Sequence, residues 1–200
     1  MEKSHALRKF IKGFILIATI VIISLLIFFF YKTEVTINVD DYTYNLPFGI
    51  NSKYRVVQGY GGLFSHIHIA ALDFEMPEGT PIFAARDGIL YMYKDDSNEG
   101  GPFPKYQKQA NYIIIKHDDG SYGCYWHLKF KGVLIRSGHI KKGQLIGYSG
   151  RTGFVMQPHL HFSVKRKLNY EMNSFVKTKF RTSVDTEFLT VGNVYERTAE

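Results

Sequence analysis

The amino-acid sequence predicts a mostly β fold, an antiparallel β-sandwich or barrel, for the greater part of its 200 residues. Aromatic residues make up 16% of the chain and 18 glycines interrupt it, a composition typical of short strands joined by tight turns. Beyond residue 31 no segment has a convincing helical period. The hydrophobic residues instead form short runs, each bounded by Gly, Asp-Asp-Gly or Lys-Gly turn signals.

These apolar runs are the expected strands of the core domain. In chain order they are residues 80–85, 88–93, 112–117, 123–128, 143–149 and 160–164. The longest irregular piece, residues 94–109, contains the turn-rich sequence NEGGPFP and is expected to form a surface loop beside a groove. Residues 32–52 alternate only weakly between polar and apolar side chains, and we expect a tether there that contains one strand.

The N-terminal segment predicts a membrane anchor. Residues 13–31 carry no charge and would span roughly 28 Å as a helix, close to the hydrocarbon thickness of a bilayer. A cleaved signal peptide is the alternative, but its apolar region is shorter and ends in small residues, whereas this run ends in three phenylalanines and a tyrosine. Basic residues precede the run and acidic residues follow it, which is typical of an N-terminus in the cytoplasm.

The expected organisation therefore has five parts: a cytoplasmic N-terminus (1–12), a transmembrane anchor (13–31), a tether (32–52), a β domain with a C-terminal extension (53–195) and a tail (196–200). The net charge of +7 does not indicate a nucleic-acid partner. The basic residues of the first dozen positions and Lys32, less Glu2, account for +4 of it and leave about +3 for everything else.

The single cysteine, Cys124, excludes an internal disulfide and a cysteine-based zinc site. Its neighbours Gly123, Tyr125 and Trp126 predict a small buried residue there. A catalytic role is not expected, because nothing nearby resembles the signature of a cysteine nucleophile.

Histidines are the side chains best placed to carry chemistry. His159 and His161, in the sequence QPHLHF, share a face of the expected strand because residues i and i+2 of a strand point the same way. Such a pair suits a metal, an acid/base site or a polar sheet face. His66 and His68 precede Asp73, and imidazoles with a carboxylate are the usual ligands of catalytic zinc. The chain has no HExxH motif, which excludes a helical metallopeptidase site.

A cupin is the rival metal-binding fold. The sequence GFVMQPHLH places Gly153 ahead of His-x-His as the first cupin motif does, but that motif continues with a glutamate ligand that three or four intervening residues separate from the second histidine. Lys165 and Arg166 stand at those places, and a cation there would repel a metal. The cupin interpretation therefore fails at its ligand.

Four blocks in order resemble the lysostaphin/LytM-type zinc metallopeptidases, which cut peptides of bacterial peptidoglycan. They are FSHIHIAALDFEMPEGTPIFAARDGIL, YIIIKHDDGSYGCYWHL, IKKGQLIGYSGRTG and PHLHFSV, and together they cover roughly residues 53–165. Each motif alone is modest, but their order and spacing are specific. The resemblance implies a β-sandwich-like core with a groove over one sheet, and one zinc ion per chain.

The resemblance also implies roles for individual residues. The zinc ligands would be His66 (or His68), Asp73 and His161, and the two histidines that do not bind the metal would be His127 and His159. Zinc polarises a carbonyl and lowers the pKa of its water to about 7. The neighbouring histidines would shuttle protons or stabilise an oxyanion.

The first metal block departs from the family's usual His-x-x-x-Asp spacing. Here the histidines lie seven and five residues before Asp73, and odd separations face opposite ways on a regular strand, so the backbone must bulge or loop within residues 67–71. Similar inserts in some family members favour His66 over His68. The two remaining histidines of this domain, His117 and His139, lie beside turns, and we expect His117 to be exposed and neither of them to have a role.

The sequence therefore predicts a membrane-anchored zinc metalloendopeptidase that hydrolyses peptide bonds of peptidoglycan. It would be a single-pass protein of the bacterial inner membrane, with its catalytic domain in the periplasm or the extracellular wall space. The alternative is an inactive relative that acts as a binding or activator module for another wall hydrolase. Such relatives typically lack some of the ligands, whereas every position here holds an acceptable residue.

Overall fold

The structure, a computed structural model, describes all residues except 1, 33–37, 63–64, 68, 170–173 and 200. The chain divides into two compact units, residues 1–36 and residues 37–200.

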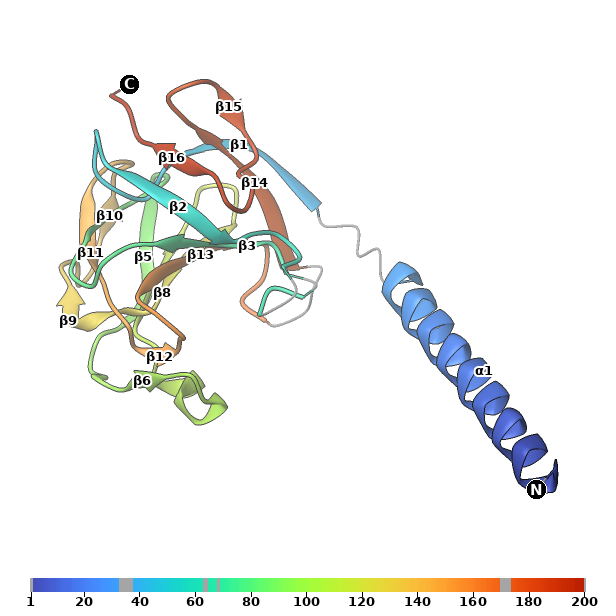
Figure 1. The fold of residues 1–200 in the computed structure, drawn as a ribbon. Helices are drawn as coiled ribbons and strands as arrows, with labels where there is room; N and C mark the ends of the chain where they lie inside the picture. The colour runs from blue at the N-terminus through green and yellow to red at the C-terminus, as the bar shows by residue number, and fades with distance from the viewer. Residues whose placement is uncertain (1, 33–37, 63–64, 68, 170–173, 200) are drawn as a thin grey trace. The chain divides into compact units, whose positions relative to one another are not determined.

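The first unit is one helix, α1, which spans Glu2–Lys32 (Figure 1). The prediction of a membrane anchor is wrong: in the part of the chain that the structure describes, no helix is both long and apolar enough to cross a membrane. A helical span needs roughly 20 consecutive, mainly apolar residues, and α1 carries Arg8, Lys9 and Lys12 before its apolar stretch. The predicted location, as a single-pass protein of the inner membrane, is wrong for the same reason.

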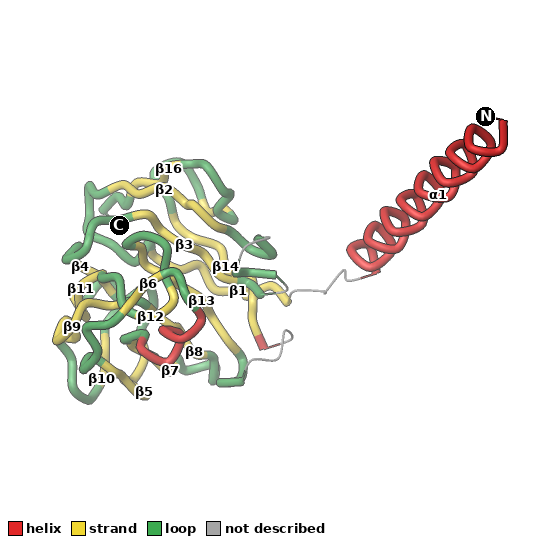
Figure 2. Tube along the Cα trace, turned by 60° about the horizontal axis from the view of Figure 1, so that its bottom comes forward, coloured by secondary structure: helices red, strands yellow, loops and turns green. Residues whose placement is uncertain are grey.

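The second unit consists of short strands joined by loops, as Figure 2 shows. They are β1 (Asn38–Asn45), β2 (Lys53–Gln58), β3 (Ala71–Glu75), β4 (Pro81–Phe83), β5 (Gly88–Lys94), β6 (Gly100–Gly101), β7 (Tyr112–Lys116), β8 (Tyr122–Trp126), β9 (Leu128–Val133), β10 (His139–Ile140), β11 (Leu145–Ser149), β12 (Gly153–Phe154), β13 (His159–Lys165), β14 (Phe175–Arg181), β15 (Thr186–Glu187) and β16 (Val194–Glu196). A 3₁₀ helix, η1 (Pro104–Gln109), lies within the segment that was expected to be a loop.

Three sheets make up this unit. An eleven-stranded sheet has the order β10-β5-β7-β8-β13-β3-β2-β16, with β14 joining β13 to β1 and β15, and a three-stranded sheet has the order β4-β11-β9. β6 and β12 form a separate pair. The predicted antiparallel arrangement holds for most neighbours, but β1 pairs with β14, and β12 with β6, in parallel. The segment expected as a tether thus supplies a strand of the large sheet.

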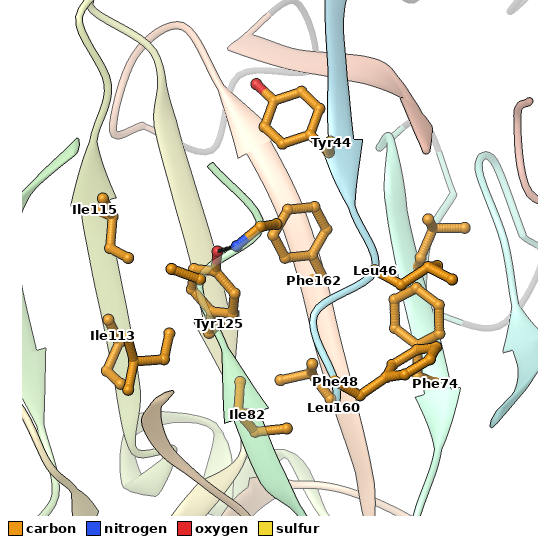
Figure 3. Packing of buried hydrophobic residues seen from close by; sticks show 14 of the residues in the cluster. Tyr44, Leu46, Phe48, Phe74, Ile82, Ile113, Ile115, Tyr125, Leu160 and Phe162 are labelled. Atoms are coloured by element: carbon orange, nitrogen blue, oxygen red, sulfur yellow. Dashed lines mark hydrogen bonds between the residues drawn. The ribbon is translucent and has the colours of Figure 1, made fainter. Parts of the chain in front are cut away.

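The hydrophobic core gathers residues from both main sheets. Ile113, Tyr125 and Phe162 of the large sheet belong to one cluster with Ile82 of β4 and Ile146 of β11, all with 0–1% of their surface exposed. The Tyr125 hydroxyl accepts a hydrogen bond from the backbone amide of Ala85 at 2.8 Å. Figure 3 shows Tyr125 among the core side chains, with a dashed line at its hydroxyl. A buried tyrosine hydroxyl needs such a partner, because a buried polar group without one destabilises the fold by about 1–3 kcal/mol.

Strand β13 carries both the core and the histidines because its side chains alternate. Leu160, Phe162 and Val164 are buried in the core. His159 and His161 therefore point to the opposite face. β13 lies between β3 and β8 and is antiparallel to both (Figure 1). Residues of these two neighbouring strands therefore lie on either side of the histidines. Burying a phenylalanine such as Phe162 stabilises the fold by about 1.5–3 kcal/mol, which holds the histidine-bearing strand in register.

Candidate metal centre

His66, Asp73 and His161 converge on one point of the large sheet. Asp73 and His161 are direct cross-strand partners on β3 and β13. His66 lies in the loop between β2 and β3, where its carbonyl accepts a hydrogen bond from the Ile69 amide at 3.0 Å. This turn brings His66 to Asp73 despite the odd spacing in the sequence.

Three ligand-type atoms of these residues lie within hydrogen-bonding distance of one another. His66 Nε2 is 3.2 Å from Asp73 Oδ1 and 3.1 Å from His161 Nδ1, and His161 Nδ1 is 2.9 Å from Asp73 Oδ1. His66 Nδ1 lies 3.0 Å from the Gly59 carbonyl, which can only accept, so this nitrogen carries the proton. His66 Nε2 therefore keeps its lone pair for the centre of the cluster.

This donor set fits a tetrahedral zinc ion. Zinc bonds to histidine nitrogen and carboxylate oxygen of about 2.0–2.2 Å place neighbouring ligand atoms roughly 3.3 Å apart in a tetrahedron. The three separations in the structure are 2.9, 3.1 and 3.2 Å. The same three residues are the group of histidine and acidic side chains that could hold a metal among the described residues.

Burial and mutual contacts set the charge of this cluster. Burial alone would raise the pKa of Asp73, but the contacts of its carboxylate with the His161 and His66 rings hold that pKa well below its usual range. Burial lowers the pKa of His161, and the hydrogen bond to Asp73 only partly opposes this. An ionised carboxylate and neutral imidazoles are the protonation states that a metal requires of its ligands.

His127 and His159 stand beside this cluster. Their ring centroids are 4.7 Å apart, and His127 is 5.9 Å from the ring of His161. His127 Nδ1 bonds to the Thr152 carbonyl and His159 Nδ1 to the Gln157 carbonyl, each at 2.8 Å, so Nε2 keeps its lone pair in both rings. Burial, with His159 and His161 nearby, lowers the pKa of His127 to about 3.

The backbone at His127 is strained. Its φ is +66°, in the left-handed region that a side chain other than glycine rarely adopts. His127 is the single residue between β8 and β9, so this conformation turns the chain from the large sheet into the three-stranded sheet. Such strain costs of order 1–3 kcal/mol and persists where the surrounding structure holds the residue in place.

Gln58 supports the carboxylate and was not found from the sequence. Its Nε2 donates to Asp73 Oδ2 at 2.9 Å and to Ser65 Oγ at 2.7 Å, while its Oε1 accepts from the Ser65 amide at 3.1 Å. A single glutamine at the end of β2 has no distinctive motif. Only the strand register, which pairs Gln58 with Asp73, reveals it.

Other histidines have different surroundings. His68, the alternative ligand, lies outside the described residues. His139 is exposed, in β10. The expectation that His117 is exposed is wrong: it is 3% exposed, with Nδ1 2.6 Å from the Asp87 carbonyl and its ring against Tyr44. Tyr44 of β1 and the backbone at Asp87 pack against the ring, so segments distant in sequence bury this residue. Cys124 is buried, as predicted.

A cleft of about 220 Å³ opens directly over the centre. Asp73, His127, His159 and His161 line it, together with Gln58, Ser65 and the segment from Phe154 to Gln157. Gly153, before that segment, has φ +87°, and a Cβ there would lie 2.5 Å from Ala110 Cβ, so only glycine brings the segment this close. His127, His159 and His161 therefore face this cleft.

A β domain with a His–Asp–His cluster and two further histidines in one cleft is typical of a metallohydrolase. The chain belongs to peptidase family M23, because the model of that family, "Peptidase family M23", matches residues 68–174, which is more than half of the chain. The match includes Asp73, His127, His159 and His161, and begins two residues after His66.

Curated relatives share this part of the chain. The peptidoglycan DD-endopeptidase ShyA of Vibrio cholerae is 36% identical over 93 residues, which are 46% of this chain and 19% of ShyA. Lysostaphin of Staphylococcus staphylolyticus is 35% identical over 128 residues, 62% of this chain and 24% of that protein. The chain thus spans less than a quarter of the length of either relative.

Solved structures of lysostaphin also resemble it. The catalytic domain of the peptidase from Staphylococcus simulans has 26% sequence identity and a TM-score of 0.45, covering 62% of this chain and 86% of that one.

Proposed function

We propose that the protein is a zinc metalloendopeptidase that hydrolyses peptide bonds of bacterial peptidoglycan. The observation that carries this proposal is the cluster of His66 Nε2, Asp73 Oδ1 and His161 Nδ1 at 2.9–3.2 Å from one another, of which Asp73 and His161 line an open cleft. Membership of peptidase family M23 and the peptidoglycan endopeptidases among the relatives support the same reaction.

In this proposal His66, Asp73 and His161 hold the zinc ion. Bound zinc would supply a Lewis acid for the scissile carbonyl and bring the pKa of water to about 7. Three protein ligands leave one tetrahedral position for the reaction. Gln58 would keep the Asp73 carboxylate in orientation through its 2.9 Å hydrogen bond to Oδ2, leaving Oδ1 for the metal.

His127 and His159 would move the protons. Each ring is fixed by its Nδ1 bond to a backbone carbonyl, so each presents an Nε2 lone pair. A ring in this tautomer can accept a proton from the attacking water and return it to the leaving amine. His159 Nε2 is 3.7 Å from Asp73 Oδ1, so it stands next to the proposed ligands without replacing one of them.

The test is digestion of purified cell walls by the full chain, with the products identified by mass spectrometry. We expect new amino termini at one type of peptide bond, loss of activity with a zinc chelator, and recovery when zinc is restored. Intact walls after incubation with the zinc-loaded protein would overturn the proposal and favour a binding module instead.

A further inference from the structure

A second hollow continues from the metal centre across the same sheet. Its floor follows from strand register: Ser163 of β13 lies opposite Cys124 of β8, which lies opposite Ile114 of β7, which lies opposite Met92 of β5. Cross-strand partners point to the same face of a sheet. These four side chains form one row across the sheet. The row lies two residues along β13 from the row that holds His161. We call this row, together with the residues that wall it, the trough.

Bulkier residues form the walls of the trough. On the side of the metal centre, His161 is followed across the sheet by Trp126 and Tyr112, whose rings lie 4.6 Å apart. On the far side Lys165 lies opposite Tyr122. The hollow over this floor measures about 160 Å³, and Lys165, Leu168 and Asn169 also line it. Another hollow, of about 180 Å³, is lined by Lys165, His161 and His127 and so connects the trough to the metal centre.

Lys165 is the formally charged residue among those that line the 160 Å³ hollow. It is 8% exposed, and its Nζ donates to the Asn169 carbonyl at 2.7 Å and lies 4.2 Å from the centroid of the Phe175 ring. These contacts hold the ammonium group at the wall, where the side chain lines both hollows. Burial lowers the pKa of Lys165, which an anion bound beside it would reverse.

Two polar atoms beside Lys165 have unused hydrogen-bonding capacity. Ser163 Oγ and Asn169 Oδ1 are buried and have no hydrogen-bond partner in the described part of the chain. The Cys124 thiol next to Ser163 is at best a weak partner. Ser163 is 2% exposed and lines the hollow that joins Lys165 to His161. Buried polar atoms without a partner are rare, and a bound ligand is one reason for them.

We infer that Lys165 and Ser163 form a subsite for a carboxylate of the peptide substrate. The carboxylate would accept from the Lys165 ammonium and the Ser163 hydroxyl, and Asn169 Oδ1 would accept from a peptide N–H. Lys165 follows His161 by four residues on β13, roughly 13 Å along the strand. A peptide extends by about 3.3–3.6 Å per residue, so the recognised carboxylate lies within about four residues of the scissile bond.

This inference rests on the proposed peptidase function and names its substrate class. It favours acidic stem peptides over an all-glycine cross-bridge, because glycine residues within a bridge offer no side-chain carboxylate. The trough would bind the substrate and select it, without taking part in bond cleavage.

The experiment compares two synthetic stem peptides that differ at one group, a free carboxylate in one and its primary amide in the other. The zinc-loaded full chain is expected to cleave the acid peptide about tenfold or more faster in kcat/KM, mainly through a lower KM, because hydrogen bonds to charged groups are strong. Added salt should reduce the preference.

Three variants assign that preference to the trough. Lys165→Met should bring the kcat/KM ratio of the two peptides close to one, and Lys165→Arg should keep a preference for the acid. Lys53→Met, which removes an exposed lysine from the start of β2, should match the wild type. Equal cleavage of both peptides by the wild-type chain would overturn the subsite but leave the peptidase standing. Cleavage of neither peptide, with walls also intact, would overturn the proposed function itself.

Discussion

Two polar clusters of this protein, one buried and one partly exposed, surround their carboxylates in opposite ways. In the first, which we call the His–Asp centre, His66, Asp73 and His161 direct acceptor-type atoms at one another at 2.9–3.2 Å. In the second, the arginine cluster, carboxylates meet guanidinium groups. Arg86 bonds to Asp118 and, at 3.0 Å, to Asp119; Arg166 bonds to Asp119 at 3.0 Å and approaches Asp40 at 3.6 Å.

The difference distinguishes a proposed metal-binding site from a cluster of ion pairs that stabilises the fold. The arginine cluster supplies its own positive charges, and the hydrogen bonds from Ser121, Arg86 and Arg166 hold the pKa of Asp119 below its usual range although burial would raise it. It connects β1, the β4–β5 turn, the β7–β8 turn and the end of β13. The His–Asp centre consists of one carboxylate and two imidazoles, so a proton or a cation must lie between its acceptor atoms. A metal ion would complete the first cluster, whereas the second is complete without one.

The largest effect is expected from His161→Ala. It removes one of the three proposed ligands from a site that would keep the fourth position open, so zinc content should fall to near zero and wall hydrolysis by roughly 10⁴-fold or more. The measurements are metal analysis of the purified variant and the rate of wall digestion. His139→Ala, at an exposed histidine of β10, is the matched control and should keep both. If His161→Ala retained its zinc, His161 would not be a ligand, and the proposed difference between the two clusters would be wrong.

The variants His159→Ala and His127→Ala test whether these two histidines lie outside the set of metal ligands. Both side chains stand beside the proposed ligands, so each variant should keep its zinc while kcat falls by about 10²–10⁴-fold, the usual contribution of a positioned acid or base. Metal stoichiometry and turnover, measured on the same preparations, decide this. A metal-free His159→Ala beside a zinc-bound His161→Ala would show that the two strand histidines have exchanged roles.

Arg86→Met tests the arginine cluster. Removing this guanidinium group leaves the partly buried Asp119 carboxylate without one of its two cationic partners. We expect the free energy of unfolding to fall by about 2–4 kcal/mol. This is less than for a fully buried ion pair, because the Asp118 side chain is 88% exposed. Zinc content should not change. Arg136→Met, which breaks the more exposed pair with Asp95, should cost less than about 1 kcal/mol. Both values come from denaturant unfolding, and loss of zinc in Arg86→Met would show that the clusters are coupled.

A smaller effect is expected from His117, next to the arginine cluster. Burial lowers its pKa below the usual 6.5, so below that pH the unfolded chain binds more protons than the folded one. Its contribution to stability is therefore constant above about pH 6.5 and decreases as the pH falls toward the folded pKa, by at most about 1.4 kcal/mol per pH unit. Between pH 7.5 and 5.5 the wild type should lose more unfolding free energy than His117→Gln. Equal losses would contradict a buried neutral His117.

The sequence predicts the His–Asp centre better than its surroundings. The alternation of β13 places His159 and His161 on one face and Leu160 and Phe162 on the other, and this depends only on local geometry. The hydrogen bond from Gln58 and the trough depend on which strands are neighbours and in what register, which no local pattern of the sequence contains. His117 was misjudged for the same reason, since its burial comes from segments distant in sequence, and residues 13–31 were misjudged because their apolar composition was taken for a complete membrane span.

The most direct test of the central claim is the zinc content of three proteins: the wild type, His66→Ala and His68→Ala. The account places His66 Nε2, fixed by the bond from Nδ1 to the Gly59 carbonyl, among the three ligands. It predicts one zinc ion per chain in the wild type and in His68→Ala, and almost none in His66→Ala. Zinc retained in His66→Ala and lost from His68→Ala would contradict it.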